Sequence, residues 1–234
     1  MKNLTKTILL LAIIAMPAIC FAQPQSCKVT FTGKQPTIKD FARAYCSQFE
    51  AGSFERKALA NFSKGSHQSR VVGGCNDCFV DIKNGYVSFI AFKYGKGGTI
   101  ENQESIEMCY WNCDNKNEKL VAVNSINNCM GFDESFLYFY RYNVKTKTMK
   151  LIKAPFDRSP KAIDMVDKSK ADKKTVNMVQ SARNEDANKY QPCFQLPRTG
   201  KNITCRMADR IAIPKKYQRE CKLIWNGSSF IPED

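Results

Sequence analysis

The sequence predicts an α+β fold: an antiparallel meander sheet of hairpins, with two N-terminal helices packed on one face, reinforced by disulfides. Three observations predict it. Apolar residues at clear helical spacing lie in residues 37–62, and strand-like runs alternate with turns over residues 75–154. The chain has 11 cysteines, ten of which remain after removal of the signal peptide predicted below. We expect residues 23–234 to form a single domain, since 212 residues suffice to bury a core.

Residues 1–22 are predicted to be a cleaved secretory signal peptide. Two lysines precede the apolar run Ile8–Ile19, and Ala22 supplies a small residue at the cleavage point. The alternative is a lipoprotein signal with Cys20 as the lipidated residue, although such signals usually place a small residue before the cysteine. We therefore expect a periplasmic or secreted protein, and no later segment is apolar for long enough to form a transmembrane helix.

The two predicted helices cover residues 37–62. In the first, Pro36 is placed as a start signal and apolar residues recur at helical spacing. In the second, Ser53 is placed as an N-cap and Gly65 ends the helix. Each helix has one apolar stripe, so both are expected to pack on the sheet.

The central hairpins are predicted over residues 75–154. Asn84-Gly85 between two apolar runs indicates a two-residue turn that sets Ile82 against Val87. The opposite face of that hairpin mixes polar residues with Phe79, which indicates partial cover. Two further strand pairs are predicted at 106–113 with 120–123 and at 136–144 with 149–153.

The rest of the chain divides into two parts. Residues 155–189 are polar with rough helical spacing, which predicts a helical or mobile connection. Residues 190–234 are predicted to form basic C-terminal hairpins, and the last of them turns at Asn226-Gly227 with Leu223, Trp225 and Phe230 on one face.

The order of elements over residues 37–154 resembles cystatin-like and nuclear-transport-factor-2-like α+β folds, in which helices cover one curved sheet. The Gln23-Pro24 start of the mature chain and the closing segment from Trp225 to Phe230 also resemble exported proteins of Gram-negative anaerobes. Neither resemblance assigns a functional residue.

Charge is concentrated toward the C-terminus. From Lys145 to Asp234 there are 20 basic and 10 acidic residues, which is most of the net charge of +12 on the mature chain. Outside the cytoplasm such a segment indicates an anionic glycan, a lipid surface or an acidic protein as partner, ahead of nucleic acid. The alternative is that the charge only maintains solubility.

The predicted binding surface combines aromatic and basic side chains. Tyr138, Tyr140 and Tyr142 alternate onto one face of a strand, where they are expected to stack against a partner. The accompanying cations are Arg141, Lys145, Lys147, Lys150 and Lys153. The alternative is that the tyrosine row belongs to the core.

The sequence gives little support for a catalytic or metal site. Cys75 and Cys78 have the spacing of a redox pair, which makes a thiol-disulfide oxidoreductase the alternative function, but a strand follows them and Asp77 raises the pKa of a neighbouring thiol. A zinc site made from these two with Cys109 and Cys113 is a further alternative, which export disfavours. The single histidine, His67, excludes sites that need two imidazoles. We therefore expect a non-enzymatic binding protein without cofactor or metal.

Overall fold

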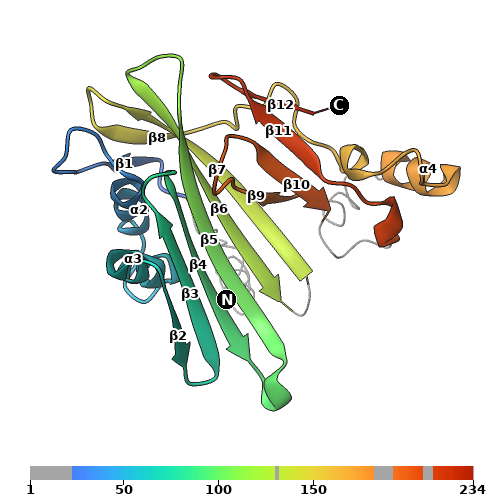
Figure 1. The fold of residues 1–234 in the computed structure, drawn as a ribbon, viewed down its shortest axis with the longest axis horizontal. Coiled ribbons are helices and arrows are strands. Elements are labelled where there is room, and N and C mark those ends of the chain that lie inside the picture. Colours follow the sequence, from blue (N-terminus) through green and yellow to red (C-terminus); the bar gives the residue numbers. More distant parts are fainter. Residues whose placement is uncertain (1–22, 130–131, 182–191, 208–212, 234) are drawn as a thin grey trace, which may run out of the picture.

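The protein is built in three layers: two helices, a large antiparallel sheet and a smaller sheet on the other face (Figure 1). The structure is a computed structural model that describes residues 23–129, 132–181, 192–207 and 213–233. The predicted signal peptide lies outside the described residues. The prediction of an α+β meander is confirmed.

The main sheet has eight strands in the order β1-β8-β7-β6-β5-β4-β3-β2. Their bounds are β1 Ser26–Lys28, β2 His67–Val71, β3 Gly74–Asp81, β4 Tyr86–Tyr94, β5 Ile100–Asn112, β6 Glu118–Cys129, β7 Phe132–Asn143 and β8 Thr148–Ile152, with the short helical turn η1 Lys96–Gly98 between β4 and β5. Strands β2 to β8 follow one another as a meander, and β1 joins the far edge by pairing with β8. Strand β2 was not predicted, because its sequence is polar apart from Val71 and only pairing with β3 makes it a strand.

Helices α2 (Ile38–Cys46) and α3 (Phe54–Lys64) cover one face of this sheet. Thr37 and Asp40 form a capping box at the start of α2, and the Ser53 hydroxyl accepts a hydrogen bond from the Arg56 N–H at 3.2 Å, as its predicted role as N-cap requires. The first core lies beneath the helices and includes Phe41 and Phe89. Both predicted helices are therefore confirmed.

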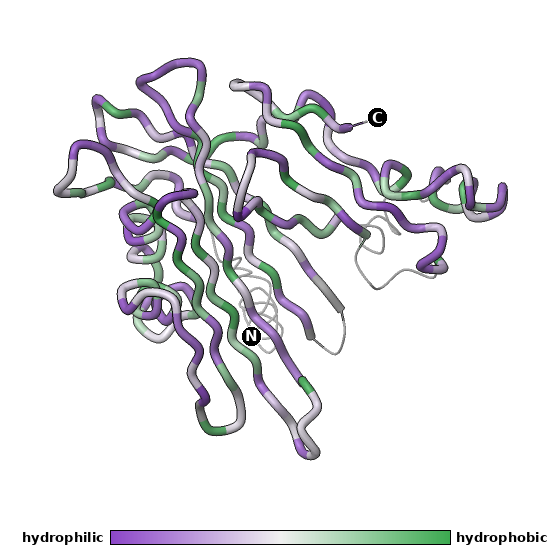
Figure 2. Tube along the Cα trace, viewed as in Figure 1, coloured by the Kyte–Doolittle hydropathy of each residue, from purple (hydrophilic) through white to green (hydrophobic). Residues whose placement is uncertain are grey.

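The second sheet is the feature that the sequence did not predict. It contains β9 (Pro192–Gln195), β10 (Ile203–Met207), β11 (Cys221–Trp225) and β12 (Phe230–Pro232) in the order β12-β11-β10-β9. It covers the face of the main sheet that the helices leave open and encloses a second core around Trp111, Phe139 and Phe230. Figure 2 shows hydrophobic segments within the strands and largely hydrophilic loops at their ends.

Both predicted Asn-Gly hairpins form, but with a register moved by two residues from the predicted one. Val80 pairs with Val87, and Trp225 with Phe230. The cause is local capping: the Asp81 carboxylate accepts from the Asn84 N–H at 3.0 Å, and the Asn226 amide oxygen accepts from two following N–H groups. A shift of two keeps the side chains that remain paired on their predicted faces. The prediction that Ile82 lies opposite Val87 is wrong, because the longer loop places Ile82 in the turn, where it is 51% exposed.

The described part of the connection after β8 combines irregular chain with short helical elements. It contains η2 (Ala162–Met165) and α4 (Lys173–Ser181), and η4 (Lys215–Tyr217) precedes β11. Residues 182–191 of the predicted connection lie outside the described residues. No helix in the described part of the chain has the length and apolarity needed to cross a membrane.

The predicted disulfide reinforcement is not seen. No disulfide joins any two of the cysteines whose side chains the structure describes. Hydrophobic burial on both faces of the main sheet holds the layers together without it, because each face has its own core.

Candidate functional site

The tyrosine row predicted as a binding surface lies mainly in the core. Tyr140 and Tyr142 are 0% exposed, and their rings pack edge-on against Tyr45 and Phe41 of α2 at centroid distances of 5.8 Å and 5.1 Å. Tyr138 is half-buried at the margin of the same core. The helices cover this face, so Tyr140 and Tyr142 do not present a surface to a partner.

The cations predicted beside that row lie around the β7–β8 hairpin. Lys145, Lys147, Lys150 and Lys153 are exposed. Arg141 forms an ion pair with Glu118 at 3.0 Å. Arg141 alternates onto the face opposite the tyrosines, so the structure does not bring the predicted aromatic and basic groups together.

Cys75 and Cys78 lie on opposite faces of β3. Cys78 is buried in the first core beneath the helices, where burial raises the pKa of its thiol to about 11. Cys75 lies in an open groove of 620 Å³, with its Sγ 3.3 Å from the Tyr94 hydroxyl. Because residues three apart on a strand point in opposite directions, these two thiols do not form the redox pair that their spacing indicates.

Metal and imidazole chemistry are equally unsupported among the described residues. No group of three or more His, Cys, Asp or Glu side chains that could hold a metal ion occurs there. The ring of His67 lies 2.7 Å from the Gly65 carbonyl and 2.9 Å from the Asn61 side-chain oxygen. Since both of its nitrogens are engaged locally, His67 ties α3 to β2.

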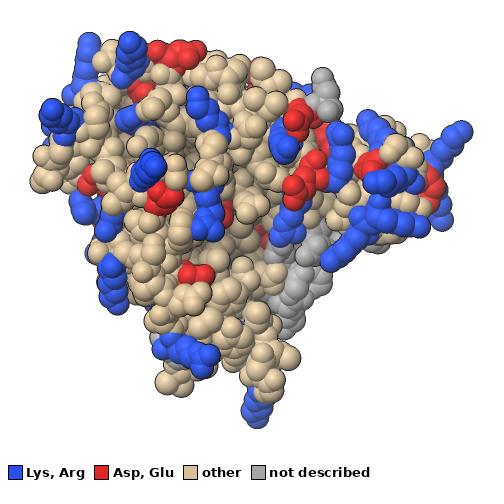
Figure 3. Space-filling model, viewed as in Figure 1, with Lys and Arg blue, Asp and Glu red and all other residues tan. Residues whose placement is uncertain are grey.

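A second concentration of cations lies on the segment that projects beside the second sheet. We call residues 157–181 and 213–220 the basic lobe; it contains η2, α4 and η4, and carries nine basic against five acidic residues. Figure 3 shows lysine and arginine gathered at this end of the molecule, which projects from the rest. The hairpin lysines lie on a different part of the surface.

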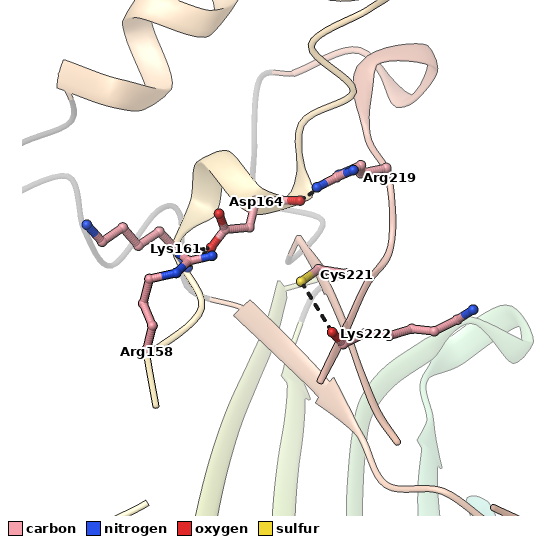
Figure 4. Close-up of polar contacts among 6 residues, drawn as sticks. All are labelled: Arg158, Lys161, Asp164, Arg219, Cys221 and Lys222. Carbon is pink, nitrogen blue, oxygen red and sulfur yellow. Dashed lines mark hydrogen bonds and ion pairs between the residues drawn. The ribbon is translucent and has the colours of Figure 1, made fainter. Parts of the chain in front are cut away.

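Asp164 organises the base of the basic lobe (Figure 4). Its carboxylate accepts hydrogen bonds from the Arg158 guanidinium at 2.7 Å and from the Lys161 N–H at 2.8 Å, and its carbonyl accepts from Arg219 Nε at 2.8 Å. Burial raises the pKa of Asp164, but the Arg158 and Lys161 hydrogen bonds outweigh it and leave the pKa below its ordinary value. Asp164 therefore stays ionised and joins η2 to the segment after η4.

Two further aspartates order the chain between η2 and α4. Asp167 accepts from Lys170 at 2.8 Å, and its hydrogen bonds with Lys170 and Ser169 lower its pKa to about 2. Asp172 accepts from the Thr175 N–H at 2.7 Å at the start of α4. Hydrogen bonding to Thr175 lowers the pKa of Asp172, and so do the charges of two lysines, Lys174 of α4 and Lys216 of η4.

Four of the lysines of the lobe lie in α4 and η4. They are Lys173 and Lys174 at the start of α4 and Lys215 and Lys216 in η4, and all four are exposed. None of the carboxylates that the structure describes forms an ion pair with them. Lys173 and Lys174 lie at the positive end of α4, and the charge of Lys216 acts on Asp172 just before it, so an external anion would relieve repulsion here.

A buried polar network holds the second sheet, and with it the lobe, against the main sheet. Glu107 of β5 accepts from the Tyr86 hydroxyl at 2.9 Å, the Leu196 N–H at 3.1 Å and the Asn124 amide at 3.3 Å. Burial raises the pKa of Glu107, although all three hydrogen bonds oppose that rise. The Asn124 amide also donates to the Phe194 carbonyl at 2.7 Å.

Sequence reasoning missed both the network and the clustering of the lobe. The partners of Glu107 lie 17 to 89 residues away in the chain, so no local pattern marks them. The lysine-rich composition of residues 145–234 was the available signal for the lobe, but it does not show that the charge of Lys216 acts on Asp172 at the start of α4.

Comparison with known proteins gives no match: no family model, no curated protein and no solved structure is similar to this chain.

Proposed function

We propose that the protein is exported and binds an anionic partner, without catalysis, through the basic lobe. The observation that carries the proposal is the group of four exposed lysines, Lys173, Lys174, Lys215 and Lys216, which form no ion pair with the described carboxylates. The partner is an acidic glycan, a lipid surface or an acidic protein. Disulfide reinforcement of the exported chain belongs to the same proposal.

The shape of the lobe supports an extended partner over a small ion. The lobe projects from the molecule, so its lysines face outward and do not enclose a cavity (Figures 1 and 3). Lysine ammonium groups act as hydrated point charges, which suit a surface of distributed anions. Such binding is screened by salt, with a Debye length of about 10 Å at 0.1 M.

The experiment compares two variants that remove the same charge from different places. In the lobe variant, Lys173, Lys174, Lys215 and Lys216 become glutamine. In the hairpin variant, the lysines of the predicted surface become glutamine: Lys145, Lys147, Lys150 and Lys153. Binding is measured on immobilised heparin, phosphatidylglycerol vesicles and polyglutamate, and unfolding midpoints confirm that both variants fold.

We expect the lobe variant to bind about thirtyfold more weakly, taking about 0.5 kcal/mol for each exposed ion pair. The hairpin variant is expected to bind within about threefold of the wild type, since it changes only the long-range field. The probe that retains the wild type identifies the class of partner. Equal weakening in both variants, or no salt-sensitive binding to any probe, refutes the proposal.

The thiol-disulfide oxidoreductase is not favoured as a second function, because Cys75 and Cys78 face opposite sides of β3.

A further inference from the structure

Two cysteines of the second sheet lie directly opposite each other. Cys205 of β10 pairs with Cys221 of β11 in antiparallel register. Directly opposite residues share a face, with Cα atoms about 4.5–5.5 Å apart. A disulfide requires a Cα separation of about 4.4–6.8 Å, so these two positions need no backbone movement to be bridged.

Both thiols are enclosed by the second core, where Cys205 is 0% and Cys221 2% exposed. Burial raises the pKa of both thiols, and Cys221 lies close enough to raise the pKa of Cys205 further. The folded protein therefore holds them protonated and out of reach of an external oxidant. A bond between them has to form before the second sheet closes.

Other pairings are disfavoured by the direction of the side chains. Cys193 of β9 is opposite Arg206, the residue after Cys205, so it points to the other face of the sheet. Cys109 shares the second core but belongs to the main sheet. It is the competitor that an experiment must exclude.

We propose that Cys205 and Cys221 form a disulfide in the exported protein, and that this bond fixes the connection carrying η4. The bond joins the two strands that flank the segment with Lys215 and Lys216, so it helps to hold Lys216 where its charge acts on Asp172 at the start of α4. The inference rests on the proposed export only for the oxidising environment in which the bond forms.

The chemistry is a two-step exchange with a small disulfide such as oxidised glutathione. The thiolate of one cysteine attacks the glutathione disulfide, which forms a mixed disulfide and releases one reduced glutathione. The second thiolate attacks the protein sulfur of that mixed disulfide and releases the second glutathione. The two cysteines lose two electrons and two protons, and one oxidised glutathione becomes two reduced ones.

The test refolds the full chain from denaturant in a glutathione redox buffer. Remaining thiols are alkylated at low pH, and the protein is digested without reductant for peptide mapping by mass spectrometry. We expect a cross-linked peptide pair that contains Cys205 and Cys221, while Cys75 and Cys78 are never linked to each other. The oxidised protein is expected to melt about 5–10 °C above its reduced form, as for a loop of similar length.

Two controls keep the result specific. The Cys109→Ser variant is expected to retain the cross-linked peptide, and the double variant Cys205→Ser, Cys221→Ser is expected to lose it. The wild-type peptide map does not depend on whether either variant folds. Oxidised wild type in which Cys205 and Cys221 are both alkylated, or are bonded to other cysteines, overturns the inference. Binding of the reduced protein to the anionic probes is measured separately, so failure of the disulfide and failure of the proposed function are distinguishable.

Discussion

Glu107 offers the sharpest test of how the two sheets are joined. Replacing it with glutamine removes the ionisable group and keeps the shape. The amide oxygen can accept from Leu196 N–H and Asn124, while the amide nitrogen donates to the Tyr86 hydroxyl, which can rotate to accept. We therefore expect Glu107→Gln to change the free energy of unfolding at pH 5 by less than about 1 kcal/mol.

Alanine at position 107 is expected to lower the free energy of unfolding more than glutamine does. The alanine leaves the Leu196 N–H without a hydrogen-bond acceptor among the described residues. Asn124 keeps its hydrogen bond to the Phe194 carbonyl. A buried unsatisfied donor costs about 1–3 kcal/mol, and the cavity left by the side chain adds to this. We expect Glu107→Ala to lower the free energy of unfolding by about 2–4 kcal/mol.

The pH dependence of stability gives an independent readout. The pKa of Glu107 is raised in the folded state, so the folded protein retains a proton that the unfolded chain releases. Its contribution is therefore fully present below the unfolded pKa, about 4.3, and is lost as pH rises through the folded pKa. The slope of that loss is at most about 1.4 kcal/mol per pH unit for one group.

Urea unfolding from pH 4 to pH 8 measures this directly. We expect the wild type to lose stability relative to Glu107→Gln as pH rises. Because Asp164 and Asp167 are present in both proteins, their opposite contribution, which is lost as pH falls through their lowered pKa values, cancels in the difference. If the free energies of unfolding of the wild type and Glu107→Gln change in parallel with pH, or if Glu107→Ala is as stable as Glu107→Gln, this account of how Glu107 joins the two sheets is refuted.

Three further substitutions test local features by urea unfolding. Ser53→Ala is expected to cost about 1 kcal/mol, because the Arg56 N–H loses its cap, and Ser53→Thr is expected to retain most of the stability. Gly85→Ala is expected to cost about 1–3 kcal/mol, since φ is +69° there and a Cβ would lie 2.7 Å from the Tyr110 ring; an unchanged midpoint would contradict the turn geometry. Tyr142→Phe is expected to be neutral or to stabilise by up to about 1 kcal/mol, since its buried hydroxyl has no hydrogen-bond partner in the described structure, and a loss of stability would reveal a missing partner.

Alternation along the strands predicted which side chains share a face, but not which face the helices cover. Tyr140 and Tyr142 lie on one face, as their spacing predicts. An aromatic row fits either a core or a binding surface by composition, and only the path of the chain from α3 into β2 decides between them. The helices cover the tyrosine face, so Tyr140 and Tyr142 belong to the core.

Register and sheet assignment depend on interactions that the sequence pattern does not contain. The Asn-Gly dipeptides predicted two hairpins, and the side chains of Asp81 and Asn226 then lengthened the loops. The last four strands were predicted as further hairpins, but their separation into a second sheet depends on contacts such as Trp111 Nε1 with the Lys201 carbonyl at 2.8 Å. Such contacts join residues far apart in the chain, so local periodicity does not reveal them.

The sequence predicted a basic binding surface but not its position on the fold. The density of lysine toward the C-terminus predicted an anionic partner, but it favoured the β7–β8 hairpin because aromatic residues lie beside it. The clustering of Lys174 with Lys216 depends on Asp172 and on the pairing of η2 with the segment after η4. Charge counts along a chain do not carry this information.

Acetylation footprinting tests the central claim most directly. The wild-type protein is labelled briefly with an amine-reactive acetyl ester, with and without the anionic probe that retains it, and the labelling of each lysine is measured by mass spectrometry. The basic lobe is predicted to be protected at Lys173, Lys174, Lys215 and Lys216, while the four exposed lysines of the β7–β8 hairpin label equally in both samples. Protection of the hairpin lysines with unchanged labelling of the lobe would contradict the claim.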